Sequence, residues 1–150
     1  MATGKNKLTR AVVVLWDNSA TVAKDLSADL IPGSLSGPGF TAGEIDMTGE
    51  SDTAENFLAD RKTNTVTAKF HANDTATTGA STVLNDTVGV VGTLTVQIGA
   101  AGVAPTTGDL EWEGEYVLLS ANLSNEGGRL IHSCTWRPSG ATPPAWGTVS

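Results

Sequence analysis

Residues 71–89, HANDTATTGASTVLNDTVG, decide the fold that this sequence predicts. They join the end of a threonine-rich strand to a turn, a short helix at about residues 78–88 and a glycine stop. Thr78 is a candidate N-cap, because its hydroxyl group can accept a hydrogen bond from the first helical turn, and Gly89 suits the C-terminal end. The Asp, His, Ser and Asn side chains of this stretch could serve catalysis, or they could simply end a strand and cap a helix.

The composition favours a β protein. The chain has 150 residues, of which 21 are Thr and 17 are Gly, and only 17% are charged. Thr is common in strands and Gly in turns, whereas helical bundles are dominated by Ala, Leu, Glu and Lys. The length is that of one domain, residues 1–150.

The charge is acidic, with a net value of −7 and a pI of about 4.6. Three of the nine cations, Lys5, Lys7 and Arg10, lie within the first ten residues, so the remainder is more acidic still. Such a surface disfavours nucleic-acid binding, which needs clustered Lys or Arg, but it suits a surface that nucleic acid must pass without sticking.

The beginning of the chain places basic residues before an apolar run, as a signal peptide does. The run Ala11–Trp16 is too short for the apolar region of a typical signal peptide and is more typical of a buried strand. No segment approaches the length of a membrane span. We therefore expect a protein that remains inside the cell or leaves by a route other than secretion, with no membrane partner.

The segments around residues 71–89 carry strand patterns. Residues 10–16 are apolar on both faces, residues 65–71 and 92–98 alternate, and residues 108–125 and 129–138 flank the turn sequence NEGG. The last two should pair as antiparallel strands. Together these patterns predict a mainly β fold: an antiparallel β-sandwich or barrel with one short flanking α-helix.

One strand changes character along its length. Glu111, Glu113 and Glu115 share one face, and Leu119, Ala121 and Leu123 continue that face as apolar. Either a bulge shifts the register or the strand runs from solvent into the core. Because three like charges on one face repel, we expect the glutamates to be exposed to solvent. They could lie on an ordinary solvated surface or along an aqueous groove that repels polyanions.

Residues 37–64 depart from the core. They begin with glycine and proline, include the alternating strand Glu44–Thr48 and continue through a polar, poorly periodic stretch. Long excursions in compact domains are usually functional or ordered by a partner. We expect a long loop or an extended hairpin arm here, and a Pro-rich C-terminal tail, residues 139–150, that docks through Trp146.

The residues that could carry chemistry form no recognisable site. His71 and His132 lack partners at metal-ligand spacing, and Cys134 is the single cysteine. No serine lies in a G-x-S-x-G turn, and the carboxylates of Asp46–Glu55 do not match a calcium loop. We predict a protein that is not an enzyme and has no cofactor or metal site.

The order of elements resembles the major tail proteins, or tail-tube subunits, of long-tailed, siphovirus-type bacteriophages. Residues 24–73 resemble the early strands and long loop of that family, and residues 74–89, DTATTGASTVLNDTVG, its turn and short helix. Residues 108–140 resemble its closing hairpin, which a short tail such as GTVS usually follows. The resemblance covers roughly residues 10–150 and lies in this order, without an invariant motif.

The resemblance implies a virion protein assembled in the host cytoplasm. Its partners would be other copies of itself, in rings (hexameric in the family) stacked into a tube, and other tail proteins at the tube ends. DNA would pass through the lumen without specific binding, and the family has no catalytic residues to carry over. A capsid decoration or head–tail joining protein, and a non-viral β-sandwich adhesion module, are the alternatives.

Two sets of residues follow as hypotheses. The excursion and both termini, residues 1–9 and 139–150, would form contacts between subunits. The contact side chains would be Phe40, Ile45, Met47, Phe57, Leu58 and Trp146. The acidic side chains on the lumen wall would be Glu111, Glu113 and Glu115, with Glu44 and Asp46.

Overall fold

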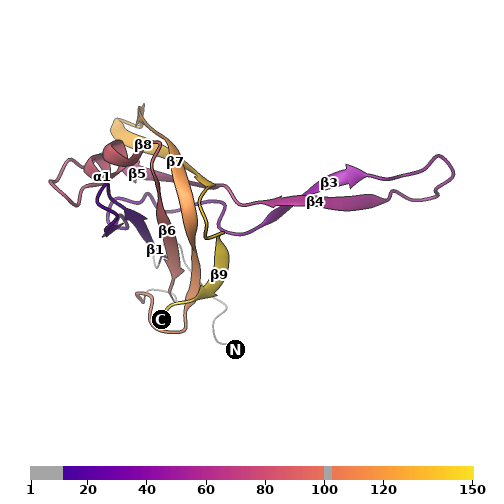
Figure 1. The fold of residues 1–150 in the computed structure, drawn as a ribbon. Helices are drawn as coiled ribbons and strands as arrows, with labels where there is room; N and C mark the ends of the chain where they lie inside the picture. The colour runs from indigo at the N-terminus through magenta and orange to yellow at the C-terminus, as the bar shows by residue number, and fades with distance from the viewer. Residues whose placement is uncertain (1–11, 100–102) are drawn as a thin grey trace.

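The structure is a computed structural model that describes residues 12–99 and 103–150 (Figure 1). It is mainly β, with antiparallel strand pairs and one short helix among the described residues, as the sequence predicts. The elements are β1 (Val12–Asp17), β2 (Ala23–Asp25), β3 (Thr41–Asp46), β4 (Phe57–Thr63), β5 (Val66–His71), α1 (Ala80–Thr87), β6 (Val91–Ile98), β7 (Leu110–Glu126), β8 (Arg129–Pro138) and β9 (Ala145–Thr148).

The strand β7 organises the body. The described strands of the body form one sheet in the order β2-β1-β6-β7-β8-β5, and β9 also pairs with β7. The first half of β7 lies between β6 and β9, whereas its second half pairs with β8 through the predicted NEGG turn. The long strand β7 therefore belongs to both halves of the folded sheet. One half contains β2, β1, β6, β9 and the start of β7, and the other contains the end of β7 with β8 and β5.

Aromatic rings fill the space between the two halves. Trp136 on β8 lies edge-on against Trp16 on β1, with ring centroids 5.8 Å apart, and against Phe70 on β5 at 6.1 Å. All three side chains are fully buried. The halves thus face one another across a common apolar core, which gives the sandwich-like architecture.

The segment between β2 and the arm crosses the open side of the sandwich. The Leu26 N–H donates to the Val14 carbonyl oxygen on β1, and the Ile31 N–H donates to the Lys69 carbonyl oxygen on β5. Ser36 then exchanges two backbone hydrogen bonds with Thr67, each 2.8 Å long. This segment links the two outer strands of the sheet and so makes the body almost a closed barrel.

Helix α1 covers one end of the core. Its N-cap is Gly79 and not the predicted Thr78, and the cap acceptor comes from a distant carboxylate: Asp29 Oδ2 accepts from the Ala80 N–H at 3.1 Å. At the other end, Trp16 Nε1 donates to Thr87 Oγ1 at 2.9 Å. The predicted glycine stop is confirmed, since Gly89 follows the helix with φ of 81°. The helix is therefore fixed at both ends by the strands and loops that it covers.

A bulge in β7 resolves the change in its pattern. The pairing with β8 shifts between Leu118 and Ser120, so that Ala121 lies opposite the buried Cys134. Leu119, at the bulge, is 51% exposed. Because the extra residue reverses the alternation, the face that carries the glutamates ends here and Ala121 packs against the core, whereas Leu123 is 54% exposed.

The predicted excursion is an antiparallel hairpin, β3–β4, that projects from the body (Figure 1). It is called the arm below and comprises residues 41–63. Gly37 lets the chain enter it: its φ is 102°, and a Cβ atom at this position would collide with the Thr65 carbonyl oxygen. Only glycine accepts both conditions, so the crossing from the body into the arm depends on this residue.

The C-terminal segment differs from the expected extension. Residues 145–148 form β9, which pairs with residues 110–113 of β7, so the tail is part of its own sheet. No strand pattern is visible in this part of the sequence, because the run has only four residues and follows two prolines. The predicted N-terminal arm, residues 1–9, lies outside the described residues.

Candidate assembly surfaces

A column of carboxylates runs along the first half of β7. Glu111, Glu113 and Glu115 alternate with buried Trp112, Gly114 and Tyr116, so they face outward from the sandwich. Each accepts a hydrogen bond: Glu111 Oε2 from Gln97 Nε2 (2.8 Å), Glu113 Oε2 from Thr95 Oγ1 (3.0 Å) and Glu115 Oε2 from the Thr142 N–H (3.1 Å). The three side chains are held in defined positions on the sheet.

The same outer face continues across β6, β1 and β2. The strand registers align Asp25, Leu15 and Thr95 with Glu113 in one row. Asp17 lies beside Thr93, whose N–H donates to its Oδ2 at 3.0 Å. In the described strands β2, β1, β6, β9 and residues 110–117, no Lys or Arg shares this face, because Lys24 belongs to the row of buried Trp16. This acidic face therefore carries five carboxylates, with Val13 and Leu15 among them and Arg137 of β8 at its border opposite Val117. The carboxylates are Asp17, Asp25, Glu111, Glu113 and Glu115.

The other two predicted acidic residues lie elsewhere. Glu44 and Asp46 are on β3 of the arm, and the arm carries them away from the body (Figure 1). Asp46 Oδ1 accepts from the Thr48 N–H at 2.9 Å, and this backbone hydrogen bond lowers the pKa of the carboxyl group. Within a single chain, therefore, the three glutamates lie together on β7, and the two arm carboxylates lie apart from them.

The arm exposes apolar side chains. Ile45 lies directly opposite Leu58, and Met47 follows on the same face, whereas Phe57 faces the other way, opposite Asp46. Their exposed fractions run from 41% to 55%. A two-stranded ribbon has marginal stability by itself and gains it by packing against something else. The described part of the chain leaves about half of this apolar surface to solvent.

The arm is joined to the body through aromatic contacts. Buried Trp112 lies edge-on against Phe40 at 5.1 Å and against Trp146 on β9 at 5.0 Å. Trp112 Nε1 donates to Tyr116 Oη, which donates to the Asn64 carbonyl oxygen at the end of β4. Burial raises the pKa of Tyr116 despite the hydrogen bond from Trp112. Two predicted contact residues, Phe40 and Trp146, thus pack within their own chain and are still 47% and 41% exposed.

Two edges of the acidic sheet are open. Of the described strands, none pairs with the outer edge of β2 or with the outer edge of β9. These edges present unpaired N–H and C=O groups, which are a ready template for strands of another chain. The sequence did not reveal either edge, because β2 and β9 are too short for a periodic pattern.

His132 and Cys134 are buried, whereas the side chain of His71, on β5, is half-buried. His132 is 3% exposed; its Nε2 lies 2.8 Å from Ser81 Oγ on α1 and its Nδ1 lies 3.1 Å from the Ala121 carbonyl oxygen. A neutral ring that donates from Nδ1 and accepts from the Ser81 hydroxyl group satisfies both contacts. Cys134 is buried, and burial raises its pKa to about 12. Sequence reasoning missed the Ser81 contact, which joins residues 51 positions apart.

The described residues hold neither a grouped set of metal ligands nor a membrane-spanning helix. Among residues 12–99 and 103–150, no three His, Cys, Asp or Glu side chains are grouped closely enough to hold a metal ion. No helix in this part of the chain has the length and apolar character needed to cross a membrane.

Comparisons with known proteins assign no family. No protein-family model matches the sequence, and no curated protein matches it.

Proposed function

We propose that this protein is a structural virion protein, a phage tail-tube subunit that forms stacked rings around a channel for DNA. The observation that carries the proposal is the arm: a projecting hairpin whose apolar side chains are 41–55% exposed in one chain. A protein that works alone gains nothing from such a surface, whereas a subunit buries it against its neighbours. The resemblance in the order of elements points to the same class.

The open sheet edges support repeated self-association. One edge, β9, lies beside the column of glutamates, and the other, β2, ends the same sheet. Strand pairing between β9 of one copy and β2 of the next would extend the sheet around a ring, while the arm would contact a second ring. A contact between unlike surfaces that does not close generates an open filament, which is the form of a tube.

The acidic face supports a lumen that DNA can pass. Duplex DNA binds clustered Lys and Arg through its phosphates, so a wall of cations would stall it. The face of Glu111, Glu113 and Glu115 carries hydrogen-bonded carboxylates. No cation shares it on β2, β1, β6, β9 or residues 110–117, and Arg137 of β8 borders it opposite Val117. In this proposal the role is structural and not catalytic, the partners are copies of the same chain with other tail proteins at the tube ends, and the protein resides in the virion.

Electron microscopy of concentrated purified protein tests the proposal. We expect rings or tubes of uniform diameter in negative stain. A protein that stays monomeric at every concentration, in the presence of other tail proteins as initiators, would contradict the proposal and favour a capsid decoration or joining protein.

A charge-reversed variant tests the position of the acidic face. Changing Glu111, Glu113 and Glu115 to Lys should leave rings and tubes intact and slow DNA release from particles built with it. The matched control changes the same three residues to Gln, which keeps one acceptor oxygen in each side chain and removes the charge. If the lysine variant releases DNA normally, the acidic face does not line the lumen.

A further inference from the structure

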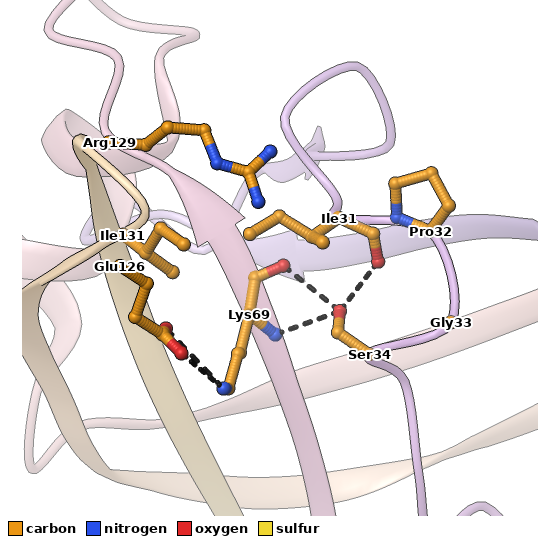
Figure 2. Close-up of a pocket in the computed structure, with 8 residues that line it drawn as sticks. All are labelled: Ile31, Pro32, Gly33, Ser34, Lys69, Glu126, Arg129 and Ile131. Atoms are coloured by element: carbon orange, nitrogen blue, oxygen red, sulfur yellow. Dashed lines mark hydrogen bonds and ion pairs between the residues drawn. The ribbon is translucent and has the colours of Figure 1, made fainter.

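A pocket of about 450 Å³ lies on the outer surface of β5 and β8 (Figure 2). The turn at Pro32 and Gly33 forms one wall, and Ile31 and Ile131 supply apolar surface. Ile131 is only 2% exposed although its side chain points away from the main core. The pocket thus combines an apolar floor with an open mouth.

Cations gather at this pocket. Lys69 Nζ forms an ion pair with Glu126 Oε1 at 3.0 Å, and Arg129 extends from the β7–β8 turn toward Ile31 (Figure 2). Within the described residues, the guanidinium group of Arg129 has no hydrogen-bond or ion-pair partner. Outside the arm, the cations described are Lys24, Lys69, Arg129 and Arg137, so half of them line this pocket. An unpaired guanidinium beside apolar surface suits a carboxylate ligand with an apolar neighbour.

The tip of the arm, residues 47–56, has the complementary chemistry. It carries Glu50, Asp52 and Glu55 and no Lys or Arg. Asp52 Oδ2 accepts from the Gly49 N–H, which orders the turn, whereas Glu50 and Glu55 are exposed. Exposed Met47 begins the tip, and Phe57 follows it directly. The tip thus offers carboxylates flanked by apolar side chains, which complement a free guanidinium group beside apolar surface.

We propose that the pocket at Arg129 receives the arm tip of a second copy of this chain. The arm of the same chain projects away from the body and leaves its tip remote from this pocket (Figure 1). The basic N-terminal segment, with Lys5, Lys7 and Arg10, is unsuited to the site because Lys69 and Arg129 would repel it. The inference rests on the proposed function, since it names the contact through which one subunit would hold the next.

Charge reversal tests the pairing. Arg129→Glu should weaken assembly about tenfold or more at low salt, because it replaces a charge-assisted hydrogen bond with repulsion. Adding Glu50→Arg and Glu55→Arg to that variant should restore assembly. The matched control is Arg137→Glu, an exposed arginine on the same strand outside the pocket, which should assemble normally. Sedimentation velocity measures all four proteins, and equal weakening by both arginine variants would overturn the proposal.

Cross-linking gives a second readout that leaves the proposed charge pair in place. The variant Ser51→Cys/Pro32→Cys, which keeps Glu50, Glu55 and Arg129, should give covalent oligomers with a short bismaleimide, because Pro32 lines the pocket and Ser51 lies at the arm tip. The control Ser51→Cys/Arg137→Cys should give few. Cys134 does not interfere, because it is buried and its pKa is about 12. If the wild type forms rings or tubes and the first variant gives no cross-link, the docking site is wrong and the proposed function stands. If the wild type forms neither, the proposed function fails and this inference with it.

Discussion

The body and the arm use similar side chains in opposite ways. In the body, Trp16 and Trp136 are fully buried between the halves of the sandwich. In the arm, Phe57 and Leu58 are 48% and 54% exposed on a ribbon only two strands thick. The body therefore buries its apolar surface within one chain, whereas the arm presents its apolar surface outward. Stability of the fold should depend on the first region and association on the second.

The joint between the two regions belongs to the body. Trp112 is fully buried, although Phe40 and Trp146, which pack on it, are nearly half exposed. Its indole N–H begins a hydrogen-bond chain through Tyr116 to the end of β4. The arm is thus oriented by a rigid base, whereas the hydrogen bonds printed for its tip, residues 47–56, all lie within the arm among the described residues.

The largest effect on stability is expected from Trp16→Ala. This change empties a buried site next to Trp136 and leaves the hydroxyl group of Thr87 without the indole N–H that it accepts. Loss of a buried Trp costs about 3–5 kcal/mol. Phe57→Ala is the matched control, because it also removes an aromatic ring and should change the unfolding free energy by less than about 0.5 kcal/mol. Urea denaturation measures the free energy of unfolding of both variants. Similar losses would contradict the inference that the fold depends on the body and not on the arm.

The sequence predicted those parts of the fold that depend on local pattern. The alternation of β5, the turn between β7 and β8 and the helix near residues 80–87 follow from periodicity and glycine punctuation. The excursion at residues 37–64 was predicted as a long loop or a hairpin, because β4 shows no periodic pattern. The sequence left two interpretations of β7 open, a bulge or a strand that runs from solvent into the core. A bulge inserts one residue into the alternation without changing the composition of the strand. Only the partner register on β8 shows where the strand shifts.

What the sequence could not predict depends on contacts between distant residues. Asp29 caps α1 from 51 positions away, which is why the local candidate Thr78 was wrong. The pocket at Arg129 needs the turn at Pro32, the strand β5 and the β7–β8 turn to meet. The five predicted acidic residues separated into two groups because the arm points away from the sheet. None of these long-range contacts can be inferred from the spacing of residues along the chain.

An intermediate effect is expected from pH and also lies in the body. Burial raises the pKa of Cys134 from its ordinary 9.0 to about 12. The folded state therefore prefers the neutral thiol, so this stabilisation is complete below pH 9 and is lost as the pH rises from 9 toward 12. The slope should reach at most about 1.36 kcal/mol per pH unit. Cys134→Ala should lack this component in urea titrations, and parallel curves for the two proteins would contradict it.

The smallest effect on stability, with a large one on assembly, is expected from Leu58→Ser. Leu58 is 54% exposed opposite Ile45, so its loss should change the unfolding free energy by less than about 0.5 kcal/mol. The same change removes apolar surface that, in the proposed tube, only a neighbouring copy can cover, and sedimentation should show fewer rings and tubes.

Leu119→Ser is the control that decides whether the arm itself is responsible. Leu119 is 51% exposed on the body at the β7 bulge, so the two substitutions remove the same side chain at nearly equal exposure. If general surface hydrophobicity drives association, both variants should lose assembly equally. If the arm is the contact element, only Leu58→Ser should lose assembly. The two leucines are almost equally exposed, so the difference would then come from the region in which each one lies.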